Sequence, residues 1–459
     1  MTPRTTRSRW QLLAVVAVLF GLLAAACGSS DDTSDDGGGG TSSTTPSGDL
    51  TEKVDVDAPG VTDTEIKFSI VSSSTNPTGS CDLDCWTTGV QAYFDYVNTE
   101  KGGIYGRKLV ADNIVDDGFS KSQEAALDVI SDDDSFGVFF YNVIGDGMQS
   151  LADENIPVYT WNTQPVLMEG NESVFGDRRP QCLQVGCWDR IVPYQMKISG
   201  RTKLASIGYS IAQSSKDCAQ NVAKSVEQFT SQIGGDAEAV YMNDNLAFGT
   251  PNGVAPEVTA MKNAGANIMA TCIVNNDTKA LMQEAKRQNL DIIPLLPQGY
   301  NDGELAAMGG AFDGGYIRNQ LRSFQGDLNE AQEKYLEYVA KNGGKTSEIS
   351  YYGWVNADLA YQGLVAAGPD FDQQKVIDAT NSFTDYTAGG IVPPQDWSKG
   401  HNAPTPDDQS AGNEYECYSL NQIQNGKFVI VGDPATPFNC WSGTNLEWTS
   451  DQPEHKSFD

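Results

Sequence analysis

Apolar and polar positions along the chain repeat in a strand-then-helix order. The first series predicts strands at 66–71, 108–113, 136–141 and 158–161, with helices at 87–98, 120–131 and 149–154. A second series predicts strands at 204–209, 237–242, 266–273 and 291–296, with helices at 216–233, 256–264 and 278–288. Strands that alternate with helices form parallel sheets covered by helices on both faces. The pattern therefore predicts an α/β protein with two doubly wound lobes.

The N-terminal segment is typical of an export signal. Arg4, Arg7 and Arg9 precede an uncharged apolar run at 12–26, which is too short for a comfortable membrane span. The run ends in Leu-Ala-Ala-Ala-Cys. This ending resembles a bacterial lipobox, in which small residues precede a cysteine that is lipidated, although Ala24 stands where leucine is usual. We expect a lipoprotein signal peptide at 1–26 and a lipid on Cys27; the alternative is an ordinary cleaved signal and a chance cysteine.

A linker follows the signal. Residues 29–49 consist of Gly, Ser, Thr and Asp with one Pro and no large apolar residue, so they cannot offset the entropy of ordering. We expect 27–59 to be a lipidated cysteine and a flexible tether. The body would then be held on the outer face of the cell membrane, outside the cytoplasm.

Composition limits what the body can be. Residues 60–459 are more than one compact core usually holds, which favours two lobes. The chain has 30 Lys and Arg against 61 Asp and Glu, a net charge of −31. This balance excludes nucleic acid as a partner. Solubility in an exposed location explains the acidity without a ligand.

Eight cysteines remain after Cys27. An even number outside the cytoplasm indicates disulfides, and pairing within short sequence distances is the simplest of the 105 possible connectivities. The expected pairs are Cys81–Cys85, Cys182–Cys187, Cys218–Cys272 and Cys417–Cys440. We expect no metal site and no cofactor, because there is no CxxC motif and the only histidines are His401 and His455.

Several segments carry a family resemblance. GVTDTEIKFSIV at 60–71 and GGIYGRKL at 102–109 come first, and later pieces appear in the same order as in the family: ALMQEAKRQNLDIIPLLPQG, GGYIRNQL and YYGWVNADLAYQGLVAAG. These segments resemble the extracellular solute-binding proteins of the branched-chain amino acid type, similar to the Leu/Ile/Val-binding protein, over residues 60–440. Such proteins serve ABC importers and have the type I periplasmic-binding fold.

The resemblance implies a domain organisation. That fold crosses between its lobes three times, here near 182–192, 316–326 and 412–420. Lobe 1 would be 60–187 and 326–415, lobe 2 would be 188–325 and 416–445, and 446–459 would be a polar, disordered tail. The implied partners are a small-molecule ligand and an ABC permease, the implied motion is hinge closure, and the implied state is a monomer.

Ligands of open α/β sheets bind beyond the carboxyl ends of the strands. Four segments there supply candidate ligand-binding residues: Ser73, Ser74 and Trp86; Tyr141 and Asn142; Trp161, Asn162 and Thr163; and Ser214, Ser215, Asn275, Gln298 and Tyr300. The alternatives are that the serines only cap the next helix and that Trp161 only packs in the core. Because Gln298 stands where amino acid binders often have an acid for the α-ammonium, we expect an amide, carbonyl or aromatic ligand.

Catalysis is not expected. The sequence has no GxSxG, HExxH, GxxxxGK[ST] or strand-linked GxGxxG motif. Three functions remain open: a solute-binding lipoprotein for an ABC permease, a ligand sensor for a membrane signalling partner, and a carboxylate-based hydrolase or lyase. We favour the first.

Overall fold

The computed structural model describes residues 50–75, 80–142, 147–161, 165–176, 189–403, 405, 413–443 and 447–459. The chain divides into two compact units, 1–45 and 46–459, and the first lies wholly outside the described residues. Five residues of interest also lie outside them: Cys27, Asn162, Thr163, Cys182 and Cys187.

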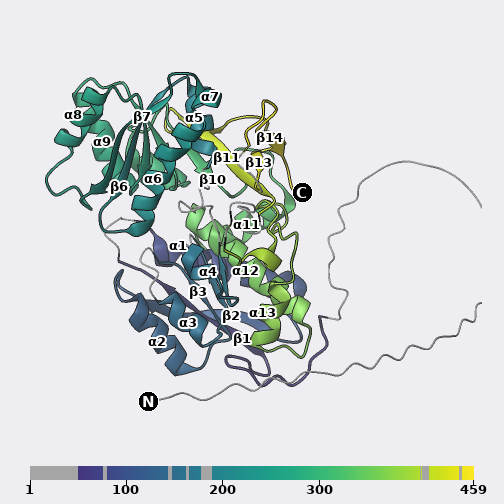
Figure 1. Cartoon of the computed structure of the whole chain (residues 1–459). Helices are drawn as coiled ribbons and strands as arrows, with labels where there is room; N and C mark the ends of the chain where they lie inside the picture. The colour runs from purple at the N-terminus through teal and green to yellow at the C-terminus, as the bar shows by residue number, and fades with distance from the viewer. Residues whose placement is uncertain are drawn as a thin grey trace, which may run out of the picture. The chain divides into compact units, whose positions relative to one another are not determined.

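The first sheet is parallel, in the order β2-β1-β3-β4-β5. Its strands are β1 (Glu65–Ser72), β2 (Lys108–Asp116), β3 (Gly137–Phe140), β4 (Val158–Thr160) and β5 (Val174–Gly176). The chain moves one way from β1 to β2 and the other way from β2 through β3 to β4. Right-handed crossovers therefore put α1 (Asp82–Tyr96) on one face and α2 (Ser122–Asp132) and α3 (Met148–Asp153) on the other (Figure 1).

Later helices complete this layer. α12 (Glu348–Ala367) packs against α1 and against α13 (Gln373–Thr380), and α11 (Glu330–Lys341) also contacts α1. Short elements finish the region: π-helical η1 (Val97–Lys101), α4 (Pro165–Met168) and 3-10 helix η2 (Trp397–Lys399). One apolar core joins the sheet to these helices, with Phe68, Phe94 and Phe139 in mutual ring contact.

The second sheet has the order β14-β13-β11-β10-β9-β8-β6-β7, and β12 pairs with β11. Its parallel strands are β6 (Lys203–Tyr209), β7 (Glu238–Leu246), β8 (Ile268–Cys272), β9 (Ile293–Leu296) and β10 (Tyr316–Asn319). Its antiparallel strands are β11 (Tyr415–Gln424), β12 (Lys427–Ile430), β13 (Phe438–Ser442) and β14 (Glu454–Lys456).

Helices cover the second sheet as well. They are α5 (Ile191–Ser199), α6 (Gln213–Gln228), α7 (Thr230–Ile233), α8 (Ala255–Ala264), α9 (Asn275–Arg287) and α10 (Asp302–Met308). Alternate β8 residues supply different cores, because Met269 packs in one apolar cluster while Ile268 and Ala270 pack in another. A sheet buried on both faces explains the nearly continuous apolar runs of these strands.

The structure confirms the predicted α/β fold class, because it has two sheets whose parallel strands alternate with helices along the chain. The predicted strands are all present, with bounds shifted by a few residues, and the helix expected at 216–233 is divided at Phe229 into α6 and α7. The expectation of a disordered tail was wrong, since β14 pairs with β13 and Trp448 is buried. The lobe boundaries stay a prediction.

The described residues contain three disulfides: Cys81–Cys85, Cys218–Cys272 and Cys417–Cys440. They are three of the four expected pairs, and the fourth lies outside the described residues. Across the described part of the chain, no helix combines the length and apolar character needed to cross a membrane.

Buried ion pairs join the segments that connect the two sheets. Arg190, just before α5, binds Glu416 of β11 with its side chain (Nε to Oε2, 2.7 Å) and with its backbone N–H (2.7 Å to Oε1). Arg318 of β10 donates to Asp189 at 2.8 Å, and its guanidinium lies 5.5 Å from the centre of the Tyr418 ring. These charges are almost fully buried, and each has its opposite beside it.

Two further guanidinium hydrogens of Arg190 are also used. They donate to the carbonyls of Ser442 (2.5 Å) and Glu447 (2.8 Å). Burial raises the pKa of the Glu416 carboxyl, and the positive charge of Arg190 opposes this shift. A buried pair with several hydrogen bonds of this kind fixes geometry even where it adds little net stability.

Removing one partner of such a pair leaves a buried charge uncompensated. We expect Glu416→Gln to lower the free energy of unfolding by about 3–5 kcal/mol. Urea denaturation would measure the change. The control is Glu238→Gln, which removes the exposed Lys203–Glu238 pair (3.4 Å) and should cost under about 1 kcal/mol. Equal losses in the two variants would contradict the structural role given to Glu416.

Candidate functional site

Four aromatic side chains form a row at the carboxyl ends of β3 and β4. Trp86 of α1 stacks on Tyr141, which follows β3, with ring centres 5.5 Å apart and planes at 28°. Tyr141 contacts Trp161, which follows β4, at 5.3 Å, and Trp161 contacts Tyr352 of α12 at 5.1 Å. The structure thus brings three predicted site residues together and adds Tyr352. We call these four residues the aromatic row.

Trp86 and Trp161 are both buried. In the described part of the chain, the indole N–H of Trp86 has no hydrogen-bond partner. A buried indole normally uses this donor, so its pairing is incomplete here. Trp86 can therefore pack in the core and still offer its indole N–H to a ligand.

Ser73 and Ser74 follow β1, and both hydroxyls bond to carboxylates. Ser73 donates to Asp117 at 2.5 Å, and Ser74 donates to Asp116 through its hydroxyl and through its backbone N–H (3.0 Å). The hydrogen bonds from Ser74 hold the pKa of Asp116 below its usual value. Neither serine caps α1, which has no side-chain cap, so the helix-capping part of the alternative was wrong. Since a hydroxyl has one proton, neither has a donor left for a ligand.

The loop after β9 reaches α12 through Glu348. The Glu348 carboxylate accepts from the backbone N–H groups of Gly299 (2.7 Å) and Tyr300 (3.1 Å). Its own backbone N–H donates to the Tyr300 carbonyl at 3.0 Å. These three bonds attach the helix layer of the first sheet to the strand ends of the second.

Tyr300 is a predicted ligand contact whose hydroxyl has other partners. It accepts from the Phe324 N–H at 2.8 Å and lies 3.1 Å from the Ser323 hydroxyl. The ring stacks on Phe324 with centres 5.8 Å apart and planes 7° apart. Tyr300 therefore supports the loop from within the core.

Asn275 and Glu304 form a polar pair at the same strand ends. Asn275 is the first residue of α9 and is buried, and its side-chain N–H donates to Glu304 of α10 at 2.7 Å. The Asn275 Oδ1 has no partner among the described residues. Burial raises the pKa of Glu304. No ion pair to Glu304 occurs within the ranges that the structure describes.

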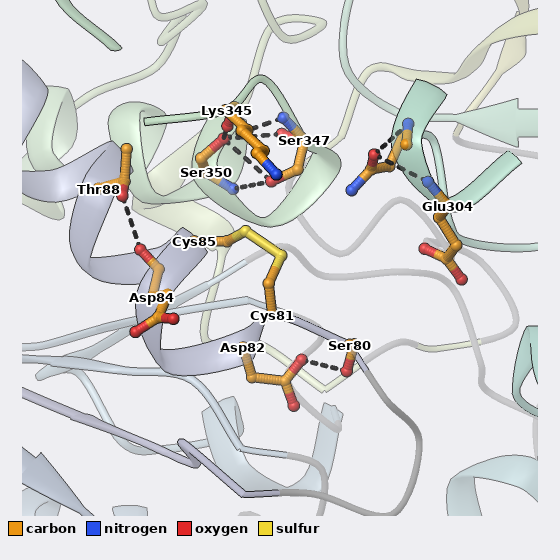
Figure 2. The surroundings of a disulfide bond; sticks show 12 residues. Ser80, Cys81, Asp82, Asp84, Cys85, Thr88, Glu304, Lys345, Ser347 and Ser350 are labelled. Atoms are coloured by element: carbon orange, nitrogen blue, oxygen red, sulfur yellow. Dashed lines mark hydrogen bonds between the residues drawn. A yellow bond between two sulfur atoms is a disulfide. The ribbon is translucent and has the colours of Figure 1, made fainter. Parts of the chain in front are cut away.

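Glu304 lies in the surroundings of the Cys81–Cys85 disulfide at the start of α1 (Figure 2). Asp82, next to this disulfide, accepts from Ser80 at 2.5 Å. Burial raises the pKa of Tyr141 well above its usual value, and the charges of Asp82, Glu348 and Glu304 raise it further. Carboxylates from three helices therefore act on one hydroxyl of the aromatic row.

Sequence reasoning missed Glu304 and Glu348. None of the ligand contacts predicted from the sequence is an acidic residue. A usable signal was the Asn301-x-x-Glu304 spacing, typical of a helix start: Asn301 caps α10 by accepting from the Gly303 and Glu304 N–H groups. That cap places Glu304 in the first turn, near the strand ends.

Other predicted residues differ in their use. Ser215 accepts from the Tyr209 N–H at 2.7 Å and donates to the Cys272 carbonyl at 2.5 Å, which supports the wall beside Cys218–Cys272. Ser214, Gln298 and Asn142 are partly buried at strand ends. No group of three His, Cys, Asp or Glu able to hold a metal ion is found in the described ranges.

The family model described as periplasmic binding protein matches residues 65–408. The chain belongs to this family. Members are extracytoplasmic solute-binding proteins of ABC transporters, which are not enzymes, so the resemblance seen in the sequence is confirmed. No curated protein sequence matches the chain.

Solved structures of similar fold include three with different ligands named. A solute-binding protein from R. palustris in complex with benzoate is 18% identical (81% of this chain and 97% of that chain covered, TM-score 0.61). A fatty acid ABC transporter substrate-binding protein from Thermomonospora curvata is 17% identical (87% and 98%, TM-score 0.63). A branched-chain amino acid transporter protein from Streptococcus pneumoniae, with isoleucine, is 14% identical (80% and 99%, TM-score 0.62). At these identities the likeness establishes the type I periplasmic-binding fold of this family member.

Gly299 tests how the polar pair is held. Its φ of +94° favours glycine, and an added Cβ would lie 2.1 Å from the Asn275 Nδ2. We expect Gly299→Ala to displace the Asn275 amide and lower the free energy of unfolding by about 1–3 kcal/mol. Chemical denaturation would measure the loss.

The matched control is Gly309→Ala at the end of α10. Gly309 also has a positive φ, +62°, but nothing lies within 4 Å of the added Cβ. Gly309→Ala should lower the free energy of unfolding by only about 1 kcal/mol, because it loses nothing but the preference of this backbone conformation for glycine. If Gly299→Ala were no more destabilising than Gly309→Ala, the close contact with Asn275 would be refuted.

Proposed function

We propose that this periplasmic binding protein captures a small polar organic molecule between two lobes and delivers it to an ABC permease. The proposal rests on one observation: an apolar aromatic surface and a pair of polar side chains lie near the same strand ends. The aromatic row comes from the first sheet and its helices, while Asn275 and Glu304 come from the second. A few polar groups beside an apolar wall are typical of small-molecule sites in proteins.

The lobes in this proposal are 60–187 with 326–415, and 188–325 with 416–445. The charges of Asp82 and Glu304, which belong to opposite lobes, both act on the Tyr141 hydroxyl. Ligand contacts from both lobes would favour the arrangement in which they lie together, and a permease would recognise that arrangement.

A ligand that binds only the folded protein must raise its stability. At 100 times its dissociation constant, a ligand adds about 2.7 kcal/mol. A thermal-shift screen of the purified protein against amino acids, amides, amines, aromatic acids and small carbonyl compounds should therefore find at least one stabilising compound. The same screen on Trp161→Ala should show a smaller shift with that compound. If none of these classes shifts the unfolding temperature, the capture of a small organic solute is rejected.

The proposal also includes a lipid anchor on Cys27 after removal of residues 1–26. A flexible linker at 29–49 would keep the body near its permease. The expectation that the linker extends to residue 59 was wrong, because the carbonyls of Leu50 and Val54 accept hydrogen bonds from Tyr105 and Arg107 of the body. Mass spectrometry of the protein from its native membrane should show diacylglyceryl-modified Cys27 as the first residue. Cys27→Ser should appear in the medium with its fold and ligand binding intact. An unmodified Cys27 in the mature protein would leave export standing and remove the anchor.

A further inference from the structure

The first observation concerns the groups that could receive a ligand carboxylate. Such a group needs free hydrogen-bond donors or a positive charge. Ser73 and Ser74 donate their hydroxyl protons to Asp117 and Asp116. Lys345 also lies in the surroundings of Cys81–Cys85, but it is an exposed residue (Figure 2). Among the buried groups described at this point, only the Trp86 indole N–H is a donor without a partner, and a single neutral donor does not match a carboxylate.

The second observation concerns hydrogen-bond acceptors that have too few donors beside them. Glu304 accepts one hydrogen bond, from the Asn275 amide, and burial disfavours its charge. The Oδ1 of that same amide is buried and accepts nothing among the described residues. A carboxylate and an amide oxygen side by side, both short of donors, match a group that carries several N–H donors and a positive charge.

The third observation concerns the surrounding charge and shape. Burial raises the pKa of the Tyr141 hydroxyl, and the charges of Asp82, Glu348 and Glu304 raise it further, as nearby negative charge does. The aromatic row offers apolar rings whose faces attract cations. A positively charged nitrogen on a flat or apolar body suits both the nearby carboxylates and the aromatic rings, whereas an anion would be repelled by the carboxylates.

We infer that the site takes an organic cation: a protonated nitrogen bound by Glu304 and the Asn275 Oδ1, on an apolar body along the aromatic row, without a carboxylate. This inference rests on the proposed function, because it names the class of solute that is captured. It differs from the ligands named for the similar structures, which include benzoate, isoleucine and a fatty acid class. The net charge of −31 would also attract a cation from solution.

Three probes with the same phenylethyl body separate the possibilities. They are 2-phenylethylamine (a cation), L-phenylalanine (a zwitterion) and 3-phenylpropionate (an anion), each titrated into the full protein by calorimetry. We expect 2-phenylethylamine to bind about 100-fold or more tightly than 3-phenylpropionate, since a charged hydrogen-bonded contact is gained in one case and a repulsion in the other. L-phenylalanine should bind more weakly than the amine.

Equal or tighter binding of either carboxylate-bearing probe overturns the inference and leaves the proposed function in place. If none of the three binds, a panel of aliphatic and aromatic amines and the matching acids is screened. Binding confined to amines supports the inference, and binding of acids overturns it. Binding of neither overturns both the inference and the proposed function.

A variant tests the assigned residue. Glu304→Gln keeps the shape and should lower the affinity for 2-phenylethylamine about 10- to 100-fold, while the affinity for 3-phenylpropionate does not fall. Glu257→Gln is the control, because Glu257 also accepts from an asparagine amide, that of Asn243 at 2.9 Å, on α8 and β7. An equal fall for both probes in Glu304→Gln would mark a structural role and overturn the assignment. The three-probe comparison on the unchanged protein stands even if this variant folds poorly.

Discussion

The arrangement of the two sheets depends on four buried charges at the segments between them. Arg190 and Asp189 stand where the chain enters the second sheet, Arg318 where it leaves, and Glu416 where it returns. Apolar side chains in these places would slide over one another with little change in energy. Charges buried at 2.7–2.8 Å from their partners cannot do so, because any shift that separates them leaves an unpaired charge away from water. The connecting strands can bend elsewhere, but the point where they meet is held.

The candidate site follows from that fixed point. The same segments bring the carboxyl ends of both parallel sheets toward one region, where Glu348 accepts from two backbone amides of the loop after β9. Disulfides close each wall near a strand end or helix start: Cys81–Cys85 at α1 and Cys218–Cys272 between α6 and β8. Each wall is therefore stiff by itself, and the freedom that remains lies between the walls. A binding protein needs that division, because stiff walls reduce the ordering that a ligand must impose.

Much of this could be predicted from the sequence, and the residues show why the rest could not. The inner parallel strands stand out because they are buried on both faces and read as apolar runs, whereas the edge strands β2 and β7 are only partly buried. β5 has three residues, too few for a period, and β14 is Glu-His-Lys, a largely exposed strand that forms only by pairing with β13. Trp86, Tyr141 and Trp161 could be proposed from the sequence, because the carboxyl end of each predicted strand can be located along the chain. The partners of Ser73 and Ser74 were not, because Asp116 and Asp117 approach them only through the pairing of β1 with β2.

The site's acidity links ligand charge to the arrangement of the lobes. Asp82 and Glu348 belong to the helices of the first sheet and Glu304 to the second, and all three raise the pKa of Tyr141. The Glu348 bonds to Gly299 and Tyr300 join the two regions at this point. A cation bound as inferred would interact with carboxylates from both lobes at once. It would therefore favour the arrangement with the lobes together more than a neutral ligand of the same shape. In this protein the sign of the ligand's charge would decide both whether it binds and how strongly it holds the lobes together.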